Sequence, residues 1–185
     1  MEANKNLFWN KAMFWGFVIA LASMLVTTVY YSTDNMASKS QSWIDWGIFV
    51  VGIIVCGMVY RQSLTEKEEF PYSKALGLGV ATALFASLIL AVFTFVLHKY
   101  IDPNLISEIL SSTEDQLLDS GLDEDMIEKQ IEISAKLMTP ALLSIYAIFG
   151  TVIKGLIISL ITSIAIRKKS IDGFEAAMNE IDDED

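Results

Sequence analysis

Four long apolar stretches constrain this chain more than any other feature of its sequence. They cover about residues 12–31, 43–60, 75–97 and 140–166, with hydrophilic segments between them. A helix needs about 20 mostly apolar residues to cross the hydrocarbon core of a bilayer, and each stretch is close to that length. With 53% hydrophobic residues among 185, the chain is also too apolar for a soluble fold of this size. The sequence therefore predicts an all-α fold, a four-helix transmembrane bundle.

The distribution of lysine and arginine predicts the orientation of the spans, because cytoplasmic loops carry an excess of basic residues. With the N-terminus inside, eight basic residues lie in the cytoplasm and four outside. We therefore expect both termini in the cytoplasm, one membrane domain over residues 1–170 and an acidic cytoplasmic tail over 171–185. We expect the first span to be an uncleaved anchor, because its apolar run is too long for a signal peptide. The inside residues are Lys5, Lys11, Arg61, Lys67, Lys74, Arg167, Lys168 and Lys169, and the outside residues are Lys39, Lys99, Lys129 and Lys136.

The segment 99–139, between the third and fourth spans, carries ten carboxylates but is patterned like two helices. Apolar residues recur at helical spacing on both sides of Gly121, which has the character of a helix stop, and Asp123 has that of a helix N-cap. We expect a short exterior helical hairpin that covers the mouth of the bundle and enters the fourth span with only a bend at Pro140. A docking surface for a partner protein is the alternative. The tail is expected to be solvated, with a cytoplasmic docking helix as its alternative.

Small side chains recur at every fourth position in the third and fourth spans. In lipid, such rows let helix backbones approach closely, so they predict packing surfaces. We expect them to hold the bundle together, and homodimerisation along one row is the alternative. The third-span row is Ala75, Gly79, Ala83, Ser87 and Ala91, and the fourth-span row is Ala147, Thr151, Gly155, Ser159 and Ser163.

Lys154 is the candidate functional charge, because it lies near the middle of the fourth span. An ammonium there costs roughly 2.5 to 3.5 kcal/mol on insertion scales. No carboxylate is expected deep in another span, and the nearest titratable candidates, Asp45 and His98, are expected at exterior ends. Three interpretations stay open. In the first, the Lys154 side chain extends toward the membrane surface and meets hydroxyl or carbonyl groups. In the second, Lys154 is neutral inside the bundle, or it binds an anion or a lipid phosphate in a water-filled cavity. In the third, it pairs with an acidic residue of a partner protein.

Motifs that would name a reaction or a cofactor are missing from the sequence. His98 is the only histidine and Cys56 the only cysteine, which predicts no metal site, and we find no nucleophile elbow or phosphate loop. Basic residues are scattered around helix ends, so nucleic acid is not expected as a partner. We therefore expect no enzyme, no catalytic, cofactor-binding or metal-binding residues, and a lipid bilayer as the environment.

Three parts of the chain resemble a known family. They are EFPYSKALG at 69–77, HKYIDP at 98–103, and GLIISLI at 155–161 followed by the basic run 167–169. Together they resemble small four-span bacterial membrane proteins grouped as domain of unknown function 4199. The resemblance covers nearly the whole chain and implies a bacterial inner-membrane location, but it brings no activity with it.

Two functional hypotheses from different classes follow. The first is a non-enzymatic accessory or assembly factor that acts through protein or lipid contacts, with a membrane-protein partner or further copies of itself. The alternative is a small oligomeric transport protein, or an anion-binding or lipid-binding protein, that uses Lys154. The direction of the Lys154 side chain, and the presence of a polar cavity, distinguish the two.

Overall fold

The computed structural model describes residues 2–33, 39–65 and 68–168. Within them, four helices are long and apolar enough to cross a membrane, over Asn6–Ser32, Ser40–Gln62, Tyr72–Ile101 and Pro140–Ile166. The predicted all-α membrane bundle is confirmed, whereas the predicted tail at 171–185 lies outside the described residues. The elements are α1 (Glu2–Ser32), α2 (Lys39–Gln62), α3 (Tyr72–Val96), the π-helical turn η1 (Leu97–Ile101), α4 (Leu105–Asp119), α5 (Glu124–Leu137) and α6 (Pro140–Ile166).

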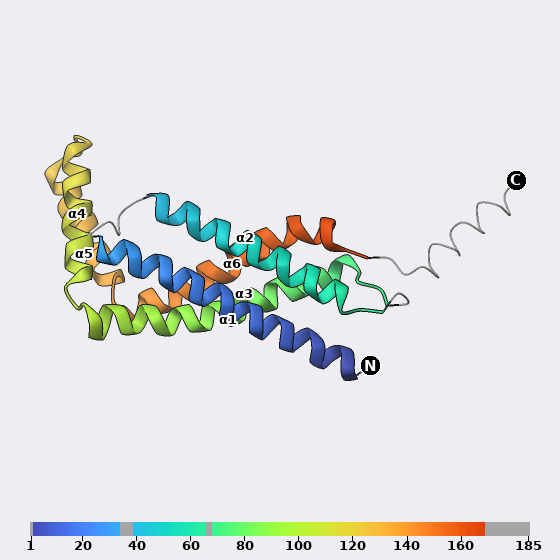
Figure 1. Ribbon diagram of the computed structural model, residues 1–185. Helices are drawn as coiled ribbons and strands as arrows, with labels where there is room; N and C mark the ends of the chain where they lie inside the picture. The colour runs from blue at the N-terminus through green and yellow to red at the C-terminus, as the bar shows by residue number, and fades with distance from the viewer. Residues whose placement is uncertain (1, 34–38, 66–67, 169–185) are drawn as a thin grey trace, which may run out of the picture.

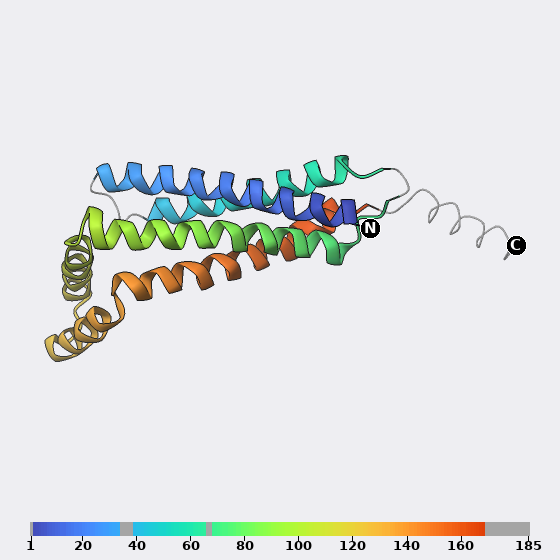
Figure 2. The ribbon, with the colours of Figure 1, turned by 90° about the horizontal axis from the view of Figure 1, so that it is seen from below.

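The four long helices run side by side along one axis, as Figure 1 shows. They are helical because a bilayer offers no water to the backbone, so each segment must satisfy its own N–H and C=O groups. The pairing of α3 with α6 is the most extensive, α1 packs on α3, and α2 contacts α1 and α6. The start of α1 and the end of α6 lie at one end of the bundle, the termini end, and α4 and α5 lie at the other, the hairpin end (Figures 1 and 2).

The interior of the bundle holds two apolar clusters. One lies toward the termini end, where Tyr60 and Phe70 are fully buried and their ring centroids are 5.0 Å apart. The other lies farther toward the hairpin end, and joins Ile19, Phe49 and Ile158 from three different helices. Most hydroxyl side chains on the spans donate to a backbone carbonyl of their own helix, as Thr82 does to the Leu78 carbonyl at 2.8 Å. The apolar core therefore continues along most of the bundle.

The segment between the third and fourth spans forms a helical hairpin of α4 and α5. Gly121 takes φ 74°, a left-handed conformation that ends α4 and that glycine adopts without strain. The Asp123 carboxylate accepts from the Asp125 N–H at 3.1 Å and caps α5. Both local predictions are confirmed.

Two other expectations about the hairpin are wrong. The hairpin does not cover the bundle mouth, because α4 and α5 pack on each other and neither packs extensively on a spanning helix among the described residues. The second helix also does not continue into the fourth span with a bend. It ends at Leu137, and α6 begins anew because the Thr139 hydroxyl caps the Leu142 N–H at 3.3 Å and Pro140 occupies the first turn.

At the termini end, the loop after α2 folds back onto the end of α6. Phe70 and Lys168 exchange two backbone hydrogen bonds, each 2.9 Å long, and form an isolated antiparallel bridge. The Lys168 ammonium also donates to the Thr65 carbonyl at 3.1 Å. Because Leu64 and Phe70 are buried, this loop belongs to the core and holds α6 against α3.

Candidate functional site

Lys154 is paired with a carboxylate of its own chain. Its ammonium Nζ donates to Asp45 Oδ2 and forms a salt bridge, with the lysine side chain 15% exposed and the aspartate 27%. The lysine side chain leans toward the start of its helix, as helical geometry requires, and thus toward the hairpin end where Asp45 lies. None of the three interpretations left open by the sequence named Asp45 as the partner of Lys154. The offsetting charge comes from α2.

The same face of α2 holds the lysine in a second way. Phe49 lies one helical turn after Asp45, and the Lys154 ammonium sits 4.1 Å from the centroid of its ring. Phe49 is fully buried. A cation over an aromatic face gains stabilisation that grows as water is excluded, so this contact adds to the ion pair. The carboxylate and the ring together fix α2 against α6 at one level of the bundle.

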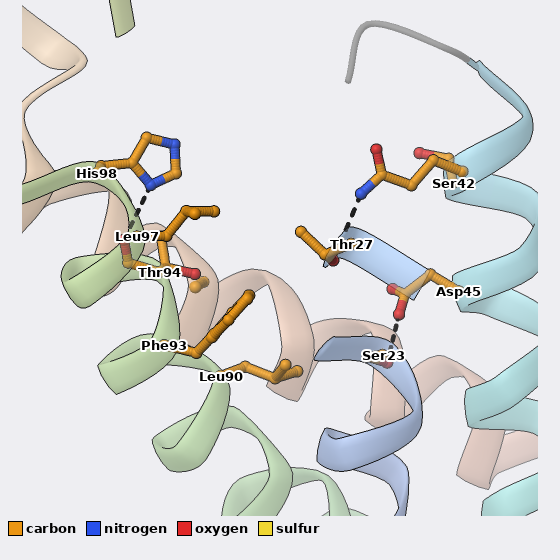
Figure 3. Close-up of a pocket in the computed structure, with 11 residues that line it drawn as sticks. Ser23, Thr27, Ser42, Asp45, Leu90, Phe93, Thr94, Leu97 and His98 are labelled. Carbon is orange, nitrogen blue, oxygen red and sulfur yellow. Dashed lines mark hydrogen bonds between the residues drawn. The ribbon is translucent and has the colours of Figure 1, made fainter. Parts of the chain in front are cut away.

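Asp45 also joins a third helix to this pair. Ser23 of α1 donates its hydroxyl to Asp45 Oδ1 at 2.5 Å, as Figure 3 shows. The two carboxylate oxygens are therefore used by two different helices. A buried charge is tolerated when it is both paired and hydrogen-bonded, and Asp45 meets both conditions. The arrangement explains how the bundle carries two charges among apolar spans.

A polar pocket opens beside Asp45 at the hairpin end. Its volume is about 360 Å³, within the usual size range of small-ligand sites. All four spans contribute to it, and in Figure 3 Asp45 and Ser23 lie on one side, with His98, Phe93 and Leu90 across from them. Lys154, the ion-pair partner of Asp45, is not among the lining residues. The lining residues are Ser23, Thr27, Gln41, Ser42, Asp45, Leu90, Phe93, Thr94, Leu97, His98 and Ala147.

His98 reaches this pocket from the π-helical turn that ends the third span. In η1 the Asp102 N–H donates to the Leu97 carbonyl at 2.8 Å, five residues back, which gives this turn one residue more than an α-helical turn. The Nδ1 atom of His98 lies 2.8 Å from the Thr94 carbonyl oxygen. A carbonyl only accepts, so Nδ1 carries a proton and donates to it, and Nε2 is the ring nitrogen left to meet a ligand. In Figure 3 the ring projects into the space that faces Asp45.

The two predicted rows of small residues face each other in the α3–α6 interface. A β-carbon built on Gly155 would overlap the Ala83 β-carbon, and one built on Gly79 would overlap the Ser159 hydroxyl. The four α6 residues from Thr151 to Ser163 in this row are buried, and Ala147 is half-buried at the pocket. All five α3 positions are buried: Ala75, Gly79, Ala83, Ser87 and Ala91.

Sequence reasoning identified Lys154 but did not select Asp45 as its partner. Asp45 was expected at a span end because the apolar run starts near Trp43, whereas α2 begins at Lys39. A usable signal was present, since Asp45 is in helical register with the buried residues Phe49, Ile53, Cys56 and Tyr60. An aspartate on the core face of a span indicates an intramembrane charge that needs a partner.

The fold and site define an all-α integral membrane protein with an intramembrane ion pair beside a polar pocket. The family model described as protein of unknown function (DUF4199) matches residues 14–168, which is most of the chain. The protein therefore belongs to this family, and the resemblance seen in its sequence is confirmed. No curated protein and no solved structure matches the chain.

Proposed function

We propose that this protein is a non-enzymatic membrane protein that binds a small polar group in the pocket at the hairpin end. The observation that carries the proposal is the double position of Asp45, which both neutralises Lys154 and lines the pocket. Ionisable residues within spans mark binding sites or pathways more often than not. We further propose a bacterial inner-membrane location with cytoplasmic termini, so that the pocket opens to the exterior.

The chemistry of the lining favours a ligand that donates hydrogen bonds. The Asp45 carboxylate is an acceptor, hydroxyls and the Gln41 amide oxygen add further acceptors, and Nε2 of His98 is one in the tautomer that carries its proton on Nδ1. The lining has no lysine or arginine, and Lys154 is paired with Asp45. This argues against the anion site suggested by the sequence. An ammonium group, from a lipid headgroup or a free amine, meets these acceptors best.

Phosphatidylethanolamine is the first ligand to test, because phosphatidylcholine has the same phosphate but no N–H donor. We expect phosphatidylethanolamine to raise the unfolding temperature of the purified protein by about 5 °C over phosphatidylcholine, if it is present near a hundredfold its dissociation constant. His98→Leu removes the Nε2 acceptor and should abolish the difference. Free ethanolamine added to phosphatidylcholine nanodiscs distinguishes a solute from a lipid.

The matched control is Val92→Leu, a change at an exposed position of the same span, which should keep the full difference between the two lipids. Equal stability in both lipids, with no effect of ethanolamine, would contradict the proposal. The same holds if His98→Leu responds like the wild type.

The accessory or assembly function is a second proposal, and an apolar groove between α1 and α2 favours it. The groove has a volume of about 400 Å³ and is lined almost wholly by apolar atoms. A β-carbon on Gly47 would meet nothing within 4 Å, and Val51 is exposed beside it. Glycine in such a groove permits close approach of another backbone, so the occupant we propose is a transmembrane helix of a partner protein.

Purification in mild detergent at native expression, followed by mass spectrometry, tests this second proposal. Gly47→Leu fills the groove and should remove a stoichiometric partner that the wild type retains. Gly150→Leu is the control, because Gly150 on α6 is equally open but lies outside the groove. Recovery of the protein alone, or only of further copies of itself, would contradict a foreign partner.

A further inference from the structure

The α5 helix has three faces of different chemistry. Ile127 is buried, on the face that packs against α4. Met126, Ile133 and Leu137 are 61%, 58% and 46% exposed, and their spacing of seven and four residues places them on one stripe of the helix. We name these three residues the α5 stripe. The rest of the helix surface carries carboxylates, at Glu124, Asp125, Glu128 and Glu132.

The two lysines of α5 lie along one side of this stripe. Lys129 lies three residues after Met126 and four before Ile133, so it is the surface neighbour of both, and Lys136 lies three residues after Ile133. Both are exposed, and Lys136 also pairs with Glu132 at 2.7 Å. An apolar stripe with lysines along its edge is a pattern found in helices that lie in a membrane surface, and on α5 the carboxylates, Glu132 among them, lie beyond these lysines.

The end of α5 lies close to the start of the fourth span. Leu137 ends the helix three residues before Pro140, where the span of α6 begins. The hairpin runs crosswise to the spans and reaches beyond the side of the bundle in both views (Figures 1 and 2). In the adjoining part of α6, Ile145 and Phe149 are exposed apolar residues as well. In Figure 2 the hairpin reaches past α6, on the side away from α1 and α2.

We propose that α5 is seated on the bilayer surface, with the α5 stripe inserted among the lipids and Lys129 and Lys136 placed at the lipid phosphates. The occupant of the unpartnered face is then the membrane itself. Long lysine side chains suit this role, because their stems stay apolar while their ammonium groups reach the headgroups. This contact between α5 and the bilayer holds the hairpin to one side and leaves the mouth of the bundle open. This inference does not depend on what the pocket binds.

Site-specific labelling of the full-length protein in liposomes tests whether the α5 stripe is inserted in the membrane. An environment-sensitive fluorophore is placed on Ile133→Cys or, as the matched control, on Glu128→Cys of the carboxylate-bearing surface. Both are made in a Cys56→Ala background, so that the chain's single native thiol is removed. Both new positions are exposed, so folding should be retained. We expect a blue-shifted emission and strong quenching by shallow nitroxide lipids at the first position, and neither at the second.

Equal, water-like emission and equal weak quenching at the two positions would overturn the proposal. Measurements at decreasing protein-to-lipid ratios test whether a second copy of the chain, and not the membrane, covers the α5 stripe. If the blue shift on Ile133→Cys disappears as the protein-to-lipid ratio falls, the stripe is covered by a second copy of the chain, and the proposed insertion into the membrane is wrong. A blue shift that is independent of this ratio supports the insertion.

Discussion

Asp45→Asn should lower the free energy of unfolding by about 3 kcal/mol, because it leaves the Lys154 ammonium inside the bundle without a compensating charge. Lys154 is the more enclosed of the two partners, at 15% exposure, and its other close contact is the ring of Phe49. That ring cannot replace a carboxylate. Reversible unfolding in mixed micelles with a denaturing detergent measures this loss.

The reverse substitution, Lys154→Met, should have a smaller effect of about 1 kcal/mol, close to that of one hydrogen bond. Asp45 keeps its hydrogen bond from the Ser23 hydroxyl and lines the pocket, so water can solvate the carboxylate that loses the lysine. The double variant Asp45→Asn with Lys154→Met should return to within about 1 kcal/mol of the wild type, since no unpaired charge remains. If the double variant is as unstable as the sum of the two single variants, the pair is not coupled, and the site as described is wrong.

Much of the fold follows from the sequence because it depends on local chemistry. Span length is set by bilayer thickness, and Gly121 and Asp123 have roles fixed by backbone geometry. The break between α5 and α6 also had a local signal, since Thr139 before Pro140 is a helix N-cap followed by a favoured first residue. The lateral position of the hairpin had no such signal, because it depends on how the hairpin helices are placed relative to the spans and not on the local sequence of α4 and α5.

The candidate site shows a different limit. Lys154 stands out in any hydropathy profile, but its partner is 109 residues away in the sequence, and only the packing of α2 against α6 brings the two together. The position of His98 depends on a π-helical turn, for which the sequence has no comparable signature. Single charges in apolar runs are therefore visible from sequence, whereas pairs and pockets need the tertiary structure.

Gly155→Ala should destabilise the bundle by about 2 kcal/mol, within the usual range for overpacking a well-filled core. The added methyl group would overlap the Ala83 β-carbon, and α3 and α6 form the most extensive interface of the bundle. Gly150→Ala on the same helix is the matched control, because its new methyl group would meet nothing within 4 Å. Both changes alter helix propensity equally, so their difference isolates the packing.

Ala83→Gly should rescue Gly155→Ala, because the Ala83 β-carbon is the main obstacle and its α-carbon stands 3.6 Å from the new methyl group, an ordinary contact. The double variant transfers one methyl group from α3 to α6 and keeps the volume of the interface. Unfolding in mixed micelles should place it closer to the wild type than Gly155→Ala alone. If Gly155→Ala and Gly150→Ala are equally stable, the small-residue rows do not form a tight α3–α6 contact, and their use between copies of the chain becomes the better account of them.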